Sequence, residues 1–343
     1  MRYHSLTGLN LRRTSLIILA LLVLAVVSIL FACATGSVSL GLMELLRALP
    51  EFWAGQRQTL AASLLELRWS RALTGFVTGG SLALAGTMMQ ALLRNPLADP
   101  YVLGVSSGAS VAALASILFF GFSWWVDLAA FGGALLISFL LLLLARQDFR
   151  GHGGSDGRSP LLILTGVILA TGCGAMITLM LTIAPDGRLR GMVFWMIGDL
   201  SHGQFRWLPW LILALVLGLL LRHARAINLL AMHAENALTL GVSVAKVRLG
   251  LFMGSALLTA SAVANAGSVG FVGLILPHAC RFVLGPDHRL LLPAVVLTGG
   301  SFLVLADTLA RTVVAPQQLP VGVITAMIGV PVFLIQLYHL RKR

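Results

Sequence analysis

Long apolar segments, separated by short charged or Gly/Pro-rich breaks, follow one another along most of the chain. Four of them run for about 17 residues or more almost without charge, which is enough for a helix to cross the hydrocarbon core of a bilayer. These four are Leu16 to Ala34, Val102 to Phe122, Leu128 to Ala145 and Leu161 to Ala184. The pattern predicts membrane-spanning helices rather than the core helices of a soluble fold.

Applied to the whole chain, the same reading predicts ten spans and therefore places both chain ends on one side of the membrane. They lie near residues 14–34, 72–92, 102–121, 127–145, 160–183, 207–221, 248–266, 269–285, 291–310 and 321–340. The segment 269–285 is interrupted by Gly270, Gly273 and Pro277, so a broken or tilted helix is as plausible there as a straight one.

Composition agrees with an all-α, polytopic membrane protein that forms one transmembrane domain over residues 1–343. Apolar residues make up 58% of the chain and charged residues only 10%, against roughly 45–50% and 25% in soluble domains. Glycines recur at small-xxx-small spacing, as at Gly75 and Gly79. Such spacing is typical of helices that pack closely in lipid.

The net charge of +12 raises the question of nucleic-acid binding. The basic residues lie between apolar segments and form no stripe with interleaved aromatic residues, so we exclude a nucleic-acid partner. With both ends inside, inner segments hold sixteen of the 24 basic residues. By the positive-inside rule both termini are expected in the cytoplasm.

The first apolar segment could also be a signal peptide, because Arg12 and Arg13 precede it and Leu30 to Cys33 resembles a lipoprotein cleavage box. The segment is longer than a signal peptide requires, and Phe31 is bulky for such a box. We therefore expect a retained first helix. Cys33, Cys173 and Cys280 show no metal or disulfide spacing and are interpreted as packing residues.

Three stretches outside the spans differ from simple connectors. Ser37 to Leu67 is long enough for an amphipathic helix on the outer face. Arg222 to Val247 is expected inside as helix, turn and helix, with the break at Gly241. Pro185 to Trp207 mixes charged residues and tryptophans, as an outer interfacial loop does.

Asp307 is the one acidic residue that lies clearly within a predicted span, and Arg311 follows four residues later on the same helical face. An ion pair that fixes the helix end and a step in a proton relay are both open, although a relay needs several such groups in series. No GxxxxGK[ST], HExxH, GxSxG or GxGxxG motif occurs. A nucleotide that drives transport would therefore bind another chain.

Several motifs resemble, in order, those of the permeases of the iron-chelate and cobalamin ABC importers. The first is the loop Arg94-Asn95-Pro96-Leu97-Ala98-Asp99-Pro100, followed by Leu103 to Gly108. The others are Gly166 to Ala170, Trp195 to Leu200, Ala237 to Gly241, Gly270 to Leu274 with Pro277, His278 and Arg281, Ala306-Asp307 with Arg311, and Leu319 to Gly322 with Gly329. Together they cover the chain from about Arg68 to Leu340.

The resemblance implies a ten-helix subunit that works as a homodimer on two ATP-binding subunits, with the path at the dimer interface. Its coupling helices, which fit a cleft on the ATPase, would lie in the inner segment and include His233, Glu235, Asn236, Leu240 and Gly241. ATP and Mg²⁺ would bind the partner ATPase, so no cofactor is expected in this chain.

The resemblance also implies a cytoplasmic gate and an outer docking face for a periplasmic substrate-binding protein. The gate maps onto Asn95, Leu97 and Ser159, although Asn95 before Pro96 can equally set a turn. The residues expected to meet acidic side chains of the binding protein are Arg47, Arg57 and Arg68.

The function expected from the sequence is that of the permease of an ATP-driven importer of a metal chelate in the bacterial inner membrane. An iron-siderophore or haem is favoured as cargo, and cobalamin is possible. The alternative is a secondary transporter driven by an ion gradient.

Overall fold

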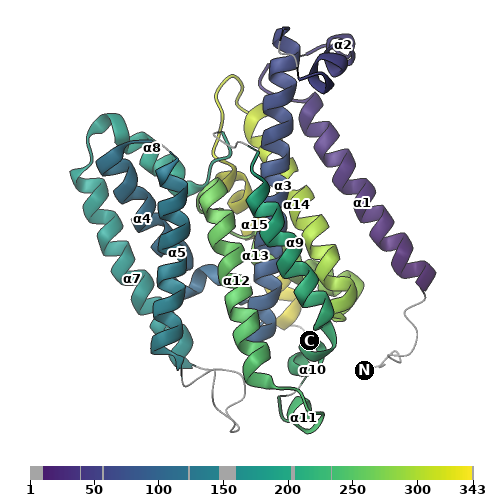
Figure 1. Cartoon of the computed structure of the whole chain (residues 1–343), viewed down its shortest axis with the longest axis vertical. Helices are drawn as coiled ribbons and strands as arrows, with labels where there is room; N and C mark the ends of the chain where they lie inside the picture. Colours follow the sequence, from purple (N-terminus) through teal and green to yellow (C-terminus); the bar gives the residue numbers. More distant parts are fainter. Residues whose placement is uncertain are drawn as a thin grey trace.

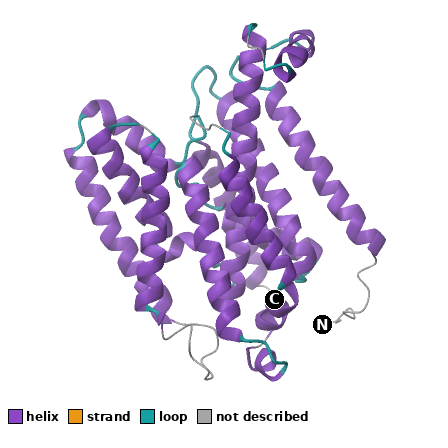
Figure 2. Cartoon of the chain, viewed as in Figure 1, coloured by secondary structure: helices purple, strands orange, loops and turns teal. Residues whose placement is uncertain are grey.

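The computed structural model describes residues 11–38, 40–55, 58–122, 124–146, 160–201, 205–232 and 234–341. Within these ranges the chain is helical throughout, with fourteen α-helices, one short 3₁₀ helix and no strand (Figure 2). The prediction of an all-α protein is confirmed.

Each of the ten predicted spans contains a helix. They are α1 (Leu11–Ala34), α3 (Leu60–Leu93), α4 (Val105–Phe120), α5 (Trp125–Leu144), α7 (Pro160–Ile183), α9 (Trp207–Arg222), α12 (Val244–Ala266), α13 (Val272–Leu284), α14 (His288–Thr312) and α15 (Val321–Arg341). Seven are long and apolar enough to cross a membrane alone, and α9 qualifies together with α10 (Ala224–Met232), from which it bends by 68°. Because α4 and α13 are shorter, the count of ten is approximate.

Two boundaries differ from the prediction. The second span was expected to start at residue 72, but α3 begins at Leu60 because Arg68 and Arg71 are buried and bonded inside the protein and do not end the helix. The stretch from Pro185 to Trp207, expected as a loop, contains α8 (Asp186–Ile197). The amphipathic helix expected between Ser37 and Leu67 is α2 (Leu42–Trp53).

The helices α3 and α14 form the centre of the bundle (Figure 1). Helix α1 packs on α14 and α3, while α12 and α13 cover other sides of α3. Helices α4, α5 and α7 form a second group that joins the centre where α5 meets α12. We name the two ends of the bundle the α2 end and the α10 end, after the helices that extend beyond them in Figure 1.

Glycine-on-glycine contacts hold the central helices together. A Cβ on Gly86 of α3 would lie 1.9 Å from the carbonyl oxygen of Gly273 on α13, and one on Gly79 would lie 2.3 Å from that of Gly299 on α14. Neither position has room for a side chain. The backbones therefore approach as closely as the small-residue spacing predicts.

Candidate functional site

A buried charge cluster lies at the α2 end, between α3 and α14. Asp307 accepts hydrogen bonds from Arg71, with Nε 2.9 Å from Oδ2 and Nη2 2.7 Å from Oδ1. Arg311 Nε lies 3.1 Å from Asp307 Oδ2, which is the i,i+4 pair that the sequence predicts. Arg71 also donates to Gln318 Oε1 at 2.7 Å, in the loop before α15. Since two guanidinium groups hold the one carboxylate, the arrangement supports the ion-pair interpretation over the proton relay.

The same region ties down the end of α1. Arg68 donates to the carbonyl oxygens of Cys33 at 3.1 Å and Ala34 at 3.2 Å, and also to that of Val38. Arg311 donates to Ala32 at 3.2 Å. The carbonyl groups of a last helical turn have no partner within the helix, and these arginines supply one. Arg68 is only 6% exposed and is occupied in this way, so it offers little surface to a docking protein.

Helix α2 has an apolar face turned away from the protein, which we name the α2 face. It consists of Met43, Leu46, Leu49 and Trp53, with Arg47 exposed among them, and Met43 and Trp53 are 63% and 82% exposed. Its opposite side packs Ala48 on the start of α3. An exposed apolar face of this kind meets another surface, either a protein or the membrane interface, rather than water alone.

The two acidic side chains of α2 are engaged within the hairpin that α2 and α3 form. Glu44 accepts from the backbone N–H of Gly41 at 2.9 Å, and Glu51 accepts from the Thr59 hydroxyl at 2.7 Å. Neither carboxylate pairs with Arg47 in the contacts of the described residues. Arg57, the other expected docking residue, lies outside the described residues.

The predicted gate lies where α3 ends. Asn95 is exposed and its Oδ1 accepts the backbone N–H of Leu97 at 3.0 Å, so it sets the turn that its position before Pro96 allows. Leu97 is 36% exposed. Ser159 lies outside the described residues. The structure therefore brings Asn95 and Leu97 together in one exposed turn at the α10 end, and their role as a gate stays a prediction.

Beyond this turn the chain re-enters the bundle as a 3₁₀ helix, η1 (Pro100–Leu103), capped by Asp99. The Asp99 carboxylate accepts the backbone N–H of Tyr101 at 2.8 Å. Its other oxygen would lie 3.5 Å from a Cβ on Gly273, at the start of α13. Gln90, near the end of α3, donates to the carbonyl oxygen of Leu274 in α13 at 3.2 Å. The loop with the family-like motif thus packs against the short helix.

The predicted coupling segment forms α10 and α11 (Ala234–Thr239), followed by a turn at Gly241, whose φ of +78° favours glycine. The expected helix-turn-helix is present. Helix α11 lies at the tip of the α10 end (Figure 1), and Leu240, directly after it in the chain, is 65% exposed. His233 lies outside the described residues, and for Glu235 and Asn236 only the helical backbone is described.

Among the described residues, one face of α7 and one face of α15 stay exposed. On α7, exposed residues recur at helical spacing at Leu164, Ile168, Thr171, Thr178 and Thr182. The three threonine hydroxyls donate to carbonyl oxygens four residues earlier, at 2.8 to 3.0 Å. This face is therefore weakly polar and offers few free donors.

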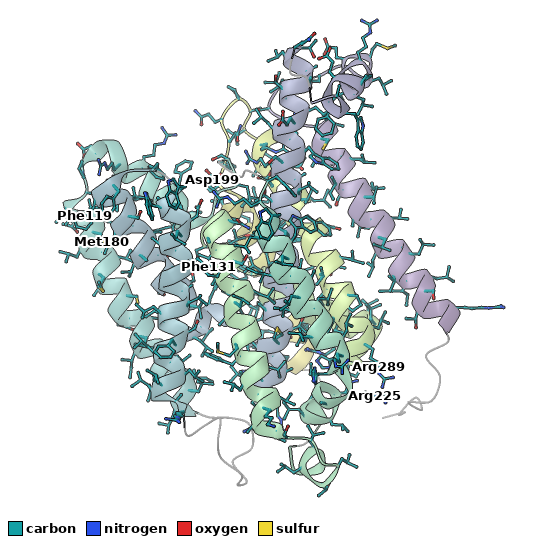
Figure 3. The ribbon with its side chains drawn as sticks, in the orientation of Figure 1. Phe119, Phe131, Met180, Asp199, Arg225 and Arg289 are labelled. Atoms are coloured by element: carbon teal, nitrogen blue, oxygen red, sulfur yellow. The ribbon has the colours of Figure 1, made fainter. Side chains whose placement is uncertain are left out.

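The exposed face of α15 is apolar. Met327, Leu334 and Ile335 are all more than half exposed. The start of α15 is fixed instead, because Gly322 donates from its N–H to the carbonyl oxygen of Gly198 at 3.3 Å. Asp199, the residue after Gly198, accepts a hydrogen bond from the backbone N–H of Ser201 at 2.8 Å. It lies between the two helix groups in Figure 3.

Comparisons with known proteins agree on one family. The family model described as the FecCD transport family matches residues 21–339. The cobalamin import system permease BtuC of Halobacterium salinarum is 40% identical over 296 residues, covering 84% of this chain and 76% of the relative. The hemin transport system permease HmuU of Yersinia pestis is 39% identical over 320 residues, covering 89% and 92%.

A solved structure described as an inward-facing conformation of a metal-chelate type ABC transporter has the same fold. It matches with a TM-score of 0.78 and 29% identity, covering 95% of this chain and 99% of that one.

Proposed function

Because the chain belongs to the FecCD transport family, we propose that it is the membrane-spanning permease of a binding-protein-dependent ABC importer for a metal chelate. The observation that carries the proposal is the match over residues 21–339, which includes the predicted coupling segment, eight of the ten predicted spans in full, and most of the first and last. The relatives are named as permeases for cobalamin and for hemin. We propose a cargo of this chemistry, a metal held in a large organic chelate, with ferric siderophores included.

The drive would come from a separate ATPase with its own ATP and Mg²⁺. The sequence has no P-loop. Helix α11 extends from the α10 end, and Leu238 and Leu240 beside its end are exposed, so an attached subunit could hold them. We place this end in the cytoplasm, at the inner membrane, because of the basic residues there. Arg222, Arg225 and Arg289 are all exposed there, and Arg225 and Arg289 are labelled in the same part of Figure 3.

The path would lie between two copies of the chain. The exposed faces of α7 and α15 support this arrangement. A second copy of the chain could cover the apolar face of α15, and the threonine face of α7 would then line the path. A weakly polar wall lets a bulky, charged chelate pass without being held. Thr171, Thr178 and Thr182 provide such a wall.

The periplasmic binding protein would dock at the α2 end. Helix α3 has 34 residues and is about 51 Å long, against about 30 Å of hydrocarbon. Its first turns and α2 therefore extend beyond the lipid, and the α2 face is placed to meet a protein. Arg47, together with Arg57, would meet acidic residues of that partner, whereas the buried Arg68 would hold α1.

The test separates this function from an ion-driven secondary transporter. The permease is reconstituted with its ATPase and binding protein in vesicles, and import of cobalamin and haemin is measured. We expect import to stop without ATP and to continue after an ionophore has dissipated the ion gradients. Import by the permease alone, or loss of import with the ionophore, would overturn the proposal.

A further inference from the structure

Helix α10 leads from α9 into the predicted coupling residues on α11 and the turn after it, and two polar links among the described residues join α10 to the bundle. One runs to the end of α3 and the other to the start of α14. Both are hydrogen bonds between elements far apart in the sequence. The links therefore define where a movement of α10 would enter the membrane-spanning part.

The first link is Arg94. It ends α3 in the left-handed conformation, with φ of +46°, and its Nε donates to the carbonyl oxygen of Leu230 at 3.1 Å. Leu230 lies in the last turn of α10, where carbonyl groups lack helical partners and the helix dipole is negative. The guanidinium group of Arg94 donates a hydrogen bond to such a carbonyl group, and its positive charge lies at the negative end of the helix dipole. Arg94 directly precedes Asn95 and Leu97, the predicted gate.

The second link is Asn228, in the middle of α10. Its Nδ2 donates to Asp287 Oδ1 at 2.8 Å, and its Oδ1 accepts the backbone N–H of His288 at 3.0 Å. Asp287 Oδ1 also accepts the backbone N–H of Arg289 at 3.0 Å. The first two N–H groups of α14 are thus capped by Asp287 and Asn228 together. Helices α10 and α14 contact each other, and Arg225 and Arg289 fall in the same part of the view in Figure 3.

Both links end on long helices. Helix α14 has 25 residues, or about 38 Å, and at its far end holds Asp307 against Arg71 of α3. Close-packed interiors transmit small displacements. A movement that reaches the start of α14 would be carried toward the α2 end, and one that reaches Arg94 would act on the gate.

We propose that Arg94 and Asn228 are positioning residues that fasten α10 to α3 and α14, so that a displacement of the coupling segment reaches the gate turn and α14 together. This inference rests on the proposed function, which supplies the ATPase that moves α10. Apolar contacts keep α10 folded on the bundle independently, because Ala224, Ile227 and Leu230 are each 1% exposed. Variants of the polar links should therefore still assemble.

The test follows two positions in the assembled complex by spin-label distance measurement between the two permease copies, with and without ATP. One label is at Leu240→Cys, on the coupling segment, and the other at Leu97→Cys, on the gate turn. Cys33, Cys173 and Cys280 are first changed to Ser. In the otherwise unchanged protein we expect ATP to shift both distances.

An exchange of side chains tests the link at Asn228. Asn228→Asp sets two carboxylates against each other, and we expect the ATP-driven shift at Leu97 to fall at least about fivefold while the shift at Leu240 remains. Asp287→Asn leaves an amide oxygen that can still accept from Asn228 Nδ2, so the ATP-driven shifts at Leu97 and at Leu240 should both stay within about twofold of the parent. The double variant restores a donor and an acceptor and should recover the shift at Leu97. If Asn228→Asp fails to assemble, Asn228→Ser removes the same bonds without adding charge.

Arg94→Asn tests the other link, because asparagine tolerates the left-handed conformation and so keeps the turn. The shift at Leu97 should again fall at least about fivefold, whereas Arg222→Asn, at an exposed arginine on α9, should leave it unchanged.

Full shifts at Leu97 in both Asn228→Asp and Arg94→Asn, or a double variant that recovers nothing, would overturn the inference alone. An absence of any ATP-driven shift at Leu240 in the parent complex would instead overturn the proposed coupling to an ATPase.

Discussion

The two ends of the bundle are held together by different kinds of interaction. At the α2 end, Arg71, Asp307 and Arg311 form a buried charge cluster with all three residues less than one-tenth exposed. At the α10 end, in partly exposed surroundings, Arg94 donates one hydrogen bond to a carbonyl group. Asn228 bonds the Asp287 carboxylate and both the backbone N–H and the ring Nδ1 of His288.

The difference has a mechanical consequence. Removing one member of a buried ion cluster leaves an uncompensated charge and costs several kcal/mol, so that end resists separation. A hydrogen bond at a partly wet site contributes about 1 kcal/mol and can be broken and remade. We therefore expect the α2 end to stay rigid while the α10 end rearranges, which suits a permease driven from the ATPase side.

The largest effect is expected from breaking the rigid end. Asp307→Asn leaves Arg71 and Arg311 buried without a counter-charge, and should lower the free energy of unfolding by about 3–5 kcal/mol. Thermal unfolding of the purified protein in detergent measures it. Asp186→Asn, at an exposed position in the first turn of α8, is the matched control and should stay within about 0.5 kcal/mol. Equal melting temperatures for the two variants would show that the cluster contributes nothing.

A smaller effect is expected between the two ends of the bundle, where α3 and α13 cross closely at Gly86 and Gly273. Gly86→Ala places a methyl group 1.9 Å from the Gly273 carbonyl oxygen and must push α13 away from α3. We expect a loss of about 1–3 kcal/mol. Gly132→Ala in α5, where a Cβ meets nothing within 4 Å, is the control and should be neutral or slightly stabilising. Comparable losses for both would point to a helix-wide effect of the methyl group and not to the crossing.

The smallest effect concerns the surface of the rigid end. Arg47→Glu should weaken binding of the cognate binding protein by roughly tenfold, with most of the loss at low salt, because it reverses the charge at the centre of the α2 face. Binding to the detergent-solubilised permease is measured by surface plasmon resonance. Arg190→Glu changes another exposed arginine of the α2 end, on α8. If both variants lose affinity equally, general electrostatic attraction is responsible and the α2 face is not the docking site.

Much of the fold could be predicted from the sequence. Apolar length located the ten helices. Gly270, Gly273 and Pro277 left a broken or tilted eighth span as plausible as a straight one, and α13 is a single helix of 13 residues with Pro277 inside it. The start of α3 was predicted wrongly because a charge was taken to end the span, whereas Arg68 and Arg71 find partners in the interior.

The candidate sites were predicted less completely. Spacing along one helix is enough to pair Asp307 with Arg311, as the structure does. The coupling segment and the gate turn were assigned from the family resemblance, and both roles stay predictions. Neither Arg71 nor Asn228 carries a local signal of its role. Arg71 stands 236 residues from Asp307, and Asn228 stands 59 from Asp287.

By itself the sequence determined that this protein crosses a membrane many times, where most of its spans lie, and to which transport family it is similar. Apolar length, helical period and motif order are properties of neighbouring residues, so they can be read along the chain. Only the tertiary structure decided that Arg68 holds α1 rather than facing a partner, that two arginines share one aspartate, and that α10 is fastened to both α3 and α14. Such partners are set by how distant helices pack, and a buried polar group takes whichever partner that packing brings within reach.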